Sequence, residues 1–303
     1  MQDNLTKTAH FHLPGLFGFF DFYRVFLPIY REHKEFFTDN CDISSIYGAP
    51  SGCIWGGGRF GGGECTAGEV LALMNEYGIS ASLTFSNSLL RHEHLSDRKC
   101  NKLCRLFEEK SGVQNGIIVH SELLAEHLKK NYPGLYLVSS TTKVLTDFQA
   151  FRHELDREEF RFAVPDFRLN MRHDLMNTLT QAEKDKVEFL CNECCYIGCN
   201  DRKECYENVS RRILGENCPE HVCTAPDGKD GYLFSKAMRN PAFISAGDIF
   251  GKWLPDGFSN FKIEGRGLGS AVLLEFLLYY MVKPEFHINV REKIYLDTML
   301  DLF

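Results

Sequence analysis

Short apolar segments alternate with longer segments of helical spacing along most of the chain. The short segments are rich in aromatic and β-branched residues, which is typical of strands, and the amphipathic segments between them are typical of helices. The pattern predicts seven strands, at 10–20, 41–47, 79–90, 115–121, 135–142, 160–170 and 187–195, and an eighth at 259–266. Strands that alternate with helices form βαβ units and a parallel sheet.

Eight strands alternating with helices match the composition of a (β/α)8 barrel. A doubly wound sheet gives a similar count, so it stays open as the alternative. We predict an α/β fold, a TIM-barrel-like (β/α)8 domain over 1–283. A cysteine-rich insertion at 191–223 separates its strands 7 and 8, and 284–303 is expected as a C-terminal extension packed on the barrel.

Several helix boundaries carry recognisable signals. Thr66 is expected as the N-cap of a helix that Gly78 ends. Ser96 is expected as the cap of the helix that follows the third strand, and Pro28 should kink the helix in which it lies. The segment 171–186 reads as one helix.

Composition narrows the function classes. Lys and Arg number 34 against 41 Asp and Glu, so the net charge is −7, and this acidic balance does not indicate a nucleic-acid partner. The chain has 25 Phe and 12 Tyr with which to form a core, which argues against a disordered protein. The longest apolar run, 271–282, contains Glu275 and is too short to span a bilayer. The first residues show no targeting segment, so we expect a cytoplasmic protein without a membrane partner.

A barrel carries its chemistry where its strands end. Polar residues that follow the apolar segments are therefore candidates, although each taken alone is more often structural. They are His12, Arg59, Asn87, His120, Ser121, Ser139, Ser140, Asp166, Arg168, Asn170, Asn192, Glu193, Lys262, Glu264 and Arg266. Arg59 stands at the centre of the glycine loop WGGGRFGGGE, which either wraps a ligand with backbone amides or is a flexible surface loop.

Cysteine is unusually frequent, and seven of the twelve cysteines fall between 191 and 223. Without a secretion signal, such clustering indicates metal or redox chemistry more than a disulfide framework. The close pairs are CxxC, CxxxC and CPEHVC, whereas structural zinc usually has two CxxC knuckles, so the spacing favours an iron–sulfur cluster over zinc. A radical-SAM motif is disfavoured, because Arg202 stands where its third cysteine would fall. We interpret Cys41, Cys100 and Cys104 as small core residues.

The segment FKIEGRG places three charged residues, Lys262, Glu264 and Arg266, at alternating positions. On a strand they share one face, where they either present a charged group to a ligand or form a structural ion network that closes the barrel.

FKIEGR resembles the KIEGR segment of the collagenase-like peptidase family, peptidase family U-32. The segment NECCYIGCNDRKECY (192–206) is similar to the form found in short members, with Cys195, Cys199, Arg202 and Tyr206 at matching positions. Cys205 stands where the family pattern has a histidine. SLTFSNSLL (82–90) is similar to the family's asparagine-containing strand end.

The resemblance implies a TIM barrel and a four-iron four-sulfur cluster held by four cysteines. It implies Cys195 and Cys199 as ligands, joined by Cys218 and by either Cys205 or Cys223. Zinc is the alternative metal. Members of the family are associated with degradation of collagen or peptides, with hydroxylation of RNA bases and with oxygen-independent hydroxylation of quinone rings. Some members work as heterodimers, so a partner from the same family is an expectation.

We therefore expect an iron–sulfur enzyme that carries out redox or modification chemistry on a small-molecule, peptide or RNA substrate. The expected catalytic residues are Glu264, Arg266, Asp166 and Arg168, and the expected substrate-binding residues are Asn87, Arg59, Asn192, Glu193 and Lys262. Peptide hydrolysis ranks lower, because the chain has neither GxSxG nor HExxH. A metal-stabilised binding protein without catalytic activity is the third hypothesis.

Overall fold

The computed structural model describes residues 7–58, 62–109, 112–265 and 269–300. Its eight strands are β1 (Ala9–Pro14), β2 (Cys41–Gly48), β3 (Ser80–Phe85), β4 (Gly116–Val119), β5 (Tyr136–Ser139), β6 (Phe160–Ala163), β7 (Glu188–Leu190) and β8 (Asn260–Lys262). Its α-helices are α1 (Phe20–Glu32), α2 (Ala67–Tyr77), α3 (Arg98–Glu108), α4 (Glu122–Asn131), α5 (Phe148–Asp156), α6 (His173–Met176), α7 (Gln181–Lys186), α8 (Arg202–Ile213), α9 (Phe234–Met238), α10 (Ala246–Asp248), α11 (Ser270–Met281) and α12 (His287–Leu300).

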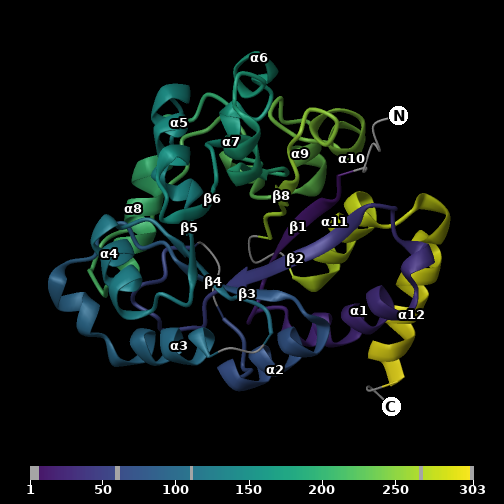
Figure 1. Ribbon diagram of the computed structural model, residues 1–303, viewed down its shortest axis with the longest axis horizontal. Coiled ribbons are helices and arrows are strands. Elements are labelled where there is room, and N and C mark those ends of the chain that lie inside the picture. The colour runs from purple at the N-terminus through teal and green to yellow at the C-terminus, as the bar shows by residue number, and fades with distance from the viewer. Residues whose placement is uncertain (1–6, 59–61, 110–111, 266–268, 301–303) are drawn as a thin grey trace.

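The strands form one parallel sheet in the order β6-β5-β4-β3-β2-β1-β8-β7. The first strand pairs with the last, with His10 opposite Asn260 and His12 opposite Lys262. A single parallel bridge, Ala163 to Val187, joins the two end strands β6 and β7. The sheet is therefore a nearly closed barrel with helices around it (Figure 1), which confirms the predicted TIM-barrel-like fold.

Successive side chains of each strand point to opposite faces of the sheet, and the barrel therefore has two apolar layers. A small cluster of buried residues fills the barrel interior, with Ile118, Val138, Val164 and Leu190 among its members. A much larger cluster packs the outer face of the strands against the helices, for example through Phe11 of β1. The inner layer is where side chains of all strands can meet, so it determines what the barrel can bind.

Local signals explain several boundaries. Thr66 and Glu69 form a capping box at the start of α2, and Gly78 ends this helix with a left-handed φ of 67°, as predicted. The expected cap at Ser96 is wrong, because the Asp97 carboxylate accepts the N–H of Cys100 at the start of α3. Pro28 lies inside α1 without ending it.

The segment expected as one helix over 171–186 is two helices, α6 and α7. Thr180 and Glu183 form a capping box that starts α7 anew, a signal that the continuous helical spacing concealed. The first strand is also shorter than expected, because β1 ends at Pro14 and α1 begins at Phe20.

The cysteine-rich region lies between β7 and β8, as predicted, and contains α8, α9 and α10. After β8, α11 leads to α12, which packs beside α1 (Figure 1). No helix in the described ranges is long and apolar enough to cross a membrane.

Candidate active site

One cavity lies at the carboxyl ends of the strands, and all eight strands or the loops that follow them contribute to its wall. Its volume is about 120 Å³. The lining residues include Pro14, Tyr47, Thr84, Ser86, Ile118, Ser140, Thr141, Thr142, Val164, Leu190, Tyr206, Lys262 and Glu264. This is the end of a (β/α)8 barrel at which catalytic groups are placed, so we call it the mouth cavity.

Three hydroxyl groups of the cavity wall have no hydrogen-bond partner among the described residues. They are Thr84 Oγ1, Ser86 Oγ and Thr141 Oγ1, and each atom is buried. Ser86 as a whole is only 2% exposed. Buried polar atoms normally have a partner, and leaving one unpaired costs about 1–3 kcal/mol. These hydroxyl groups are therefore available to a bound ligand.

A buried charged group forms the floor of the mouth cavity. Lys262 Nζ lies 2.5 Å from Glu188 Oε1, and the two residues are 5% and 1% exposed. His12 Nδ1 lies 3.9 Å from the second oxygen of Glu188. Burial opposes ionisation of Glu188, but the charge and the hydrogen bond of Lys262 outweigh it, so the pKa of Glu188 lies below its ordinary value. Burial also lowers the pKa of His12, so the ionised pair is Lys262 with Glu188.

Neighbouring polar groups fix the orientation of the His12 ring. Asn260 Nδ2 donates to the carbonyl of Asp185, so its Oδ1 is the atom that accepts from His12 Nε2, at 3.4 Å. His12 Nδ1 is then the acceptor for the hydroxyl of Ser45, at 2.8 Å.

Tyr47 lies between the floor and the rim of the cavity. Its ring packs under Lys262, with the ammonium 3.9 Å from the ring centroid, and its hydroxyl donates to the carbonyl of Ile263 at 2.6 Å. Burial, followed by the carboxylates of Glu264 and Glu188, raises the pKa of Tyr47. The phenol is therefore protonated and holds the chain between Lys262 and Glu264 in place.

Two of the expected substrate-binding residues are occupied by the protein backbone. Asn192 accepts from the N–H of Glu264 at 2.7 Å and donates to its carbonyl at 3.1 Å, which holds the end of β8 against β7. Asn87 donates to the carbonyls of Ile54 and Ser210 at 2.9 and 3.3 Å. Both asparagines are fully buried, so the structure places them behind the cavity wall.

A second buried ion network joins β6, β7 and α8. Asp166 is fully buried, and its two oxygens accept from Nε and Nη2 of Arg168 at 2.6 and 3.2 Å. Arg202 is 1% exposed, with Nε 3.4 Å from Asp166 Oδ2 and Nη1 2.7 Å from Glu193 Oε2. The Arg202 guanidinium also lies over the ring of Tyr206, which lines the mouth cavity.

This network positions the chain that follows β7. Glu193 Oε1 accepts from the N–H groups of Cys194 and Cys195, both at 2.9 Å, and Arg168 donates to the carbonyl of Cys199 at 3.0 Å. The nitrogens of Arg202 make close charge contacts but no well-aligned hydrogen bond within the described residues. Asp166, Arg168 and Glu193 therefore act on the cysteine loop more directly than on the cavity.

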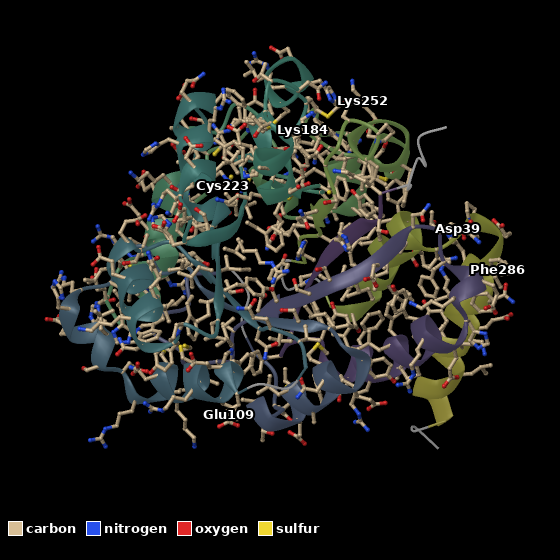
Figure 2. The ribbon with its side chains drawn as sticks, in the orientation of Figure 1. Asp39, Glu109, Lys184, Cys223, Lys252 and Phe286 are labelled. Atoms are coloured by element: carbon tan, nitrogen blue, oxygen red, sulfur yellow. The ribbon has the colours of Figure 1, made fainter. Side chains whose placement is uncertain are left out.

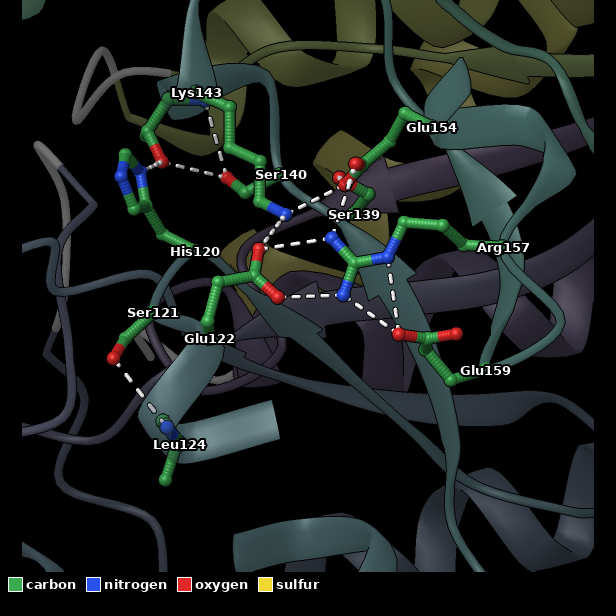
Figure 3. Close-up of polar contacts among 11 residues, drawn as sticks. His120, Ser121, Glu122, Leu124, Ser139, Ser140, Lys143, Glu154, Arg157 and Glu159 are labelled. Atoms are coloured by element: carbon green, nitrogen blue, oxygen red, sulfur yellow. Dashed lines mark hydrogen bonds and ion pairs between the residues drawn. The ribbon is translucent and has the colours of Figure 1, made fainter. Parts of the chain in front are cut away.

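A third network follows β4 and β5 (Figure 3). His120 Nδ1 lies 2.8 Å from Thr142 Oγ1, which in turn donates to Ser140 Oγ at 2.9 Å. Both hydroxyl residues line the mouth cavity. Lys143 follows Thr142 in the chain, and its ammonium forms ion pairs with Glu154 at 2.5 Å and Glu122 at 2.7 Å. Burial, followed by Lys143 and Lys203, lowers the pKa of His120 to about 4, so its imidazole is neutral at neutral pH.

A larger groove continues from the mouth cavity toward α8. Its volume is about 700 Å³, and the two hollows share Ala49, Gly58 and Thr84. Residues 49–54 and 56–58 form one side of the groove, and residues of α8 lie on the other. Gly57 is required in this wall, because a Cβ there would lie 2.3 Å from the backbone of Ser86.

No protein-family profile and no curated protein matches the chain. A solved structure does match: the U32 peptidase Mk0906, with a TM-score of 0.51 and 13% sequence identity over 88% of this chain and 96% of that one. The chain has the fold of a U32 peptidase. The fold expected from the FKIEGR resemblance is therefore confirmed.

In this U32 fold, the candidate metal ligands lie beyond the mouth cavity. Cys195, Cys199, Cys205 and Cys218 are half-buried, and Cys223 is exposed at the surface (Figure 2). Burial raises the pKa of the Cys199 thiol, with smaller contributions from Cys195 and Cys223.

These thiols have the chemistry of zinc or iron–sulfur ligands, and Cys195 lies within electrostatic reach of the Arg202 guanidinium. However, no three Cys, His, Asp or Glu side chains of the described residues converge on a common point. Among the described residues these cysteines are not gathered around one point, so they are candidate ligands only and no step is derived through a metal.

Two expected site residues, Arg59 and Arg266, lie outside the described residues. The structure places Lys262 and Glu264 at the cavity. Sequence reasoning missed Glu188 and Tyr47. Glu188 carried a signal, because a carboxylate inside the apolar run VEFL on an inner barrel strand needs a buried partner.

Proposed function

We propose that the chain is an enzyme of the U32 peptidase family that modifies a substrate whose reacting end enters the mouth cavity. The supporting observation is the composition of that cavity's wall. An ammonium and two carboxylates, from Lys262, Glu188 and Glu264, lie at a small apolar hollow that also exposes unpaired hydroxyl groups. Apolar pockets with a few convergent polar groups are typical of substrate sites.

The size of the two hollows sets the form of the substrate. The mouth cavity, of about 120 Å³, is the smaller of the two hollows, so it takes the reacting group of the substrate. The adjoining groove of about 700 Å³ has room for the remainder. We therefore favour a peptide over a free small molecule, and the net charge of −7 does not favour an RNA segment.

Lys262 and Glu264 are the residues we assign to the reaction. Lys262 is the proton donor or electrostatic partner of the reacting group, and Glu188 holds its ammonium in place. Glu264 is placed by Asn192 through its backbone and reaches the cavity from the rim. The hydroxyl groups of Thr84, Ser86 and Thr141 orient the substrate by hydrogen bonds.

The test of these assignments compares wild-type protein with Glu264→Gln. Both are purified without oxygen and incubated with a peptide digest, with total RNA and with a metabolite extract, and products are identified by mass spectrometry. We expect a product that Glu264→Gln forms at least about 100-fold more slowly. Glu275→Gln on α11, whose side chain is paired with Arg291 away from the cavity, is the matched control and should keep the wild-type rate. No wild-type product in any mixture would favour the binding protein without catalytic activity.

For the cofactor we propose an iron–sulfur cluster held by cysteines of the segment after β7, which would supply electrons. Quantitation of iron, sulfide and zinc in protein purified without oxygen tests this. We expect about four irons and four sulfides per chain. One zinc without iron would instead make the cysteines a zinc site, and absence of both metals would contradict a metal-dependent function.

Peptide hydrolysis is the second candidate, and the contact between His120 and Thr142 at the cavity wall favours it. A hydroxyl group next to a neutral imidazole is the core of a nucleophilic site. In the structure Thr142 Oγ1 donates its proton to Ser140 Oγ, so this hydroxyl must first turn toward His120 Nδ1 to be activated. No carboxylate within the described residues hydrogen-bonds the other ring nitrogen of His120, so the group that orients a catalytic histidine is missing. Hydrolysis of fluorescently labelled gelatin, lost in both His120→Gln and Thr142→Val, would establish this function, and intact gelatin would contradict it.

We further propose a cytoplasmic location and a second member of the same family as partner. The location rests on the twelve cysteines, which are free thiols in the structure. Co-purification from the native source, followed by mass spectrometry, tests the partner.

A further inference from the structure

We propose that Cys53 and Cys100 form a reversible disulfide that fixes the wall between the mouth cavity and the groove. The sulfur atoms of these two thiols lie 2.7 Å apart. This distance is within about 0.7 Å of a disulfide bond length of about 2.05 Å. The proposal does not depend on the proposed function, because neither cysteine belongs to the assigned site.

Both cysteines are held on backbones that are themselves fixed. Cys100 lies in the first turn of α3, where its N–H donates to the capping carboxylate of Asp97 at 2.8 Å. Cys53 lies one residue before Ile54 and two before Trp55 in the loop after β2. The Ile54 carbonyl accepts from Asn87, and the Trp55 indole donates to the carbonyl of His94 at 2.8 Å. The two sulfurs are therefore close without a movement of either element.

Access differs between the two thiols. Cys100 is 0% exposed, whereas Cys53 lines the groove, which has room for a small oxidant. Because an oxidant in the groove reaches Cys53 first, we expect Cys53 to react with the oxidant. Cys100 then reacts with the oxidised Cys53. Cys104, one turn further along α3, is equally buried, but no other sulfur of the described residues lies within hydrogen-bond distance of it.

The oxidant is a low-molecular-weight disulfide such as glutathione disulfide. The Cys53 thiolate attacks one of its sulfurs and releases one thiolate, which leaves a mixed disulfide on Cys53. The Cys100 thiolate then attacks Cys53 Sγ and releases the second thiolate. Two protein thiols are oxidised, one disulfide is reduced, and the two protons lost by the protein are taken up by the two released thiolates.

The Cys53–Cys100 disulfide would restrain the segment that separates the mouth cavity from the groove. Residues 52–54 and 56–57 line the groove, and Gly58 lines both hollows. Linking Cys53 to α3 attaches this segment to the outer helix layer. Oxidation therefore makes the wall of the substrate path rigid.

The experiment uses full-length protein, reduced and then equilibrated with glutathione disulfide and glutathione at defined ratios. After acid quenching and alkylation, trypsin releases Cys100 in the peptide of residues 100–102 and Cys53 in that of residues 35–59. The latter also holds Cys41, so the measurement is made in Cys41→Ser. We expect these two peptides to be cross-linked, with two alkylatable thiols lost and recovered on reduction, and Tm to rise by about 5 °C or more.

Three variants make the result decisive. Cys53→Ser and Cys100→Ser should each abolish the cross-link and the rise in Tm, while circular dichroism checks that they fold. Cys104→Ser is the matched control and should keep both effects. Glutathione retained on Cys53, a cross-link to Cys104, or no thiol loss at any ratio would each overturn the proposal.

Discussion

At the scale of single residues, the unusual feature is the amount of charge held away from water. Asp166, Arg202 and Glu193 are all at most 2% exposed. Together with the partly exposed Arg168 they form a network of two carboxylates and two guanidinium groups behind the loop that carries the cysteines. A buried ion pair contributes little compared with an apolar replacement, but removing one partner leaves a charge that is expensive to bury. Each of these buried charges is therefore tolerated only while its partners are present.

We expect Asp166→Asn to lower the free energy of unfolding by about 3–5 kcal/mol, because the charges of Arg168 and Arg202 lose their shared partner. Urea unfolding followed by circular dichroism measures this. Asp174→Asn is the matched control, since Asp174 pairs with Arg172 at the surface, and it should leave the free energy of unfolding nearly unchanged. Equal costs for the two variants would show that Asp166 is not held as described.

His120 makes the stability depend on pH. Its pKa is about 4 when folded, and its ordinary value is 6.5. Between these values the unfolded chain binds a proton that the folded chain does not, so the stability from His120 is complete above pH 6.5 and is lost as pH falls toward 4. The loss amounts to at most about 3 kcal/mol.

The expected outcome is that His120→Gln loses less stability between pH 7 and pH 5 than the wild type, measured as urea midpoints at both values. The groups around the imidazole, Lys143, Lys203, Glu122 and Glu154, are unchanged in this variant. His92→Gln, at an exposed position, should keep the wild-type dependence. Parallel pH profiles for all three proteins would contradict the assignment.

At the scale of elements, α2 has clear boundaries at both ends. The Thr66 hydroxyl accepts the N–H of Glu69, and the Glu69 carboxylate accepts the N–H of Thr66 at 2.8 Å. Thr66 and Glu69 are exposed, so a substitution of Thr66 changes the cap without changing the packing of the core.

We expect Thr66→Ala and Gly78→Ala each to lower the free energy of unfolding by about 1 kcal/mol. The first removes the cap, and the second forces a Cβ into a φ of 67°. Urea unfolding again measures both. Gly68→Ala, inside α2 with nothing but the Thr66 hydroxyl within 4 Å of its Cβ, should stabilise the protein instead.

Elements with local signals were predictable, and contacts between distant residues were not. The capping residues of α2 and the alternation of strands and helices are properties of neighbouring residues, so the sequence predicted them. Ser96 was the wrong cap because Asp97, one residue later, offers the same chemistry. Lys262 and Glu264 were identified from their own spacing, whereas the partner of Lys262, Glu188, is 74 residues away and depends on how the barrel closes.

At the scale of the whole molecule, the barrel is weakest where β6 meets β7, because one backbone bridge joins them. Asn170 reinforces this seam from the β6 side. Its Nδ2 donates to the carbonyls of Leu190 and Ala242 at 2.7 and 3.1 Å, and the residue is fully buried.

We expect Asn170→Ala to lower the free energy of unfolding by about 1–3 kcal/mol per carbonyl left without its donor, and to speed amide hydrogen exchange in β6 and β7. Hydrogen exchange followed by mass spectrometry shows where the change falls. Asn131→Ala, which removes an exposed donor on α4, is the control. Faster exchange spread over all strands, or none in β6 and β7, would contradict a local seam.

The pairing of β1 with β8 also sets the order in which the protein can be completed during synthesis. Asn260, the side-chain partner of His12, follows 248 residues later in the chain. At about 5–20 residues per second, the ribosome needs roughly 12–50 s to deliver it. During that time β1 has an open edge, which is a risk for association with other chains. His12 and Ser45, on the first two strands, place polar side chains in the barrel interior. Inward-pointing polar groups make the unfinished edge a poor template for a strand of another chain. The same residues that support the cavity floor therefore also protect the nascent chain.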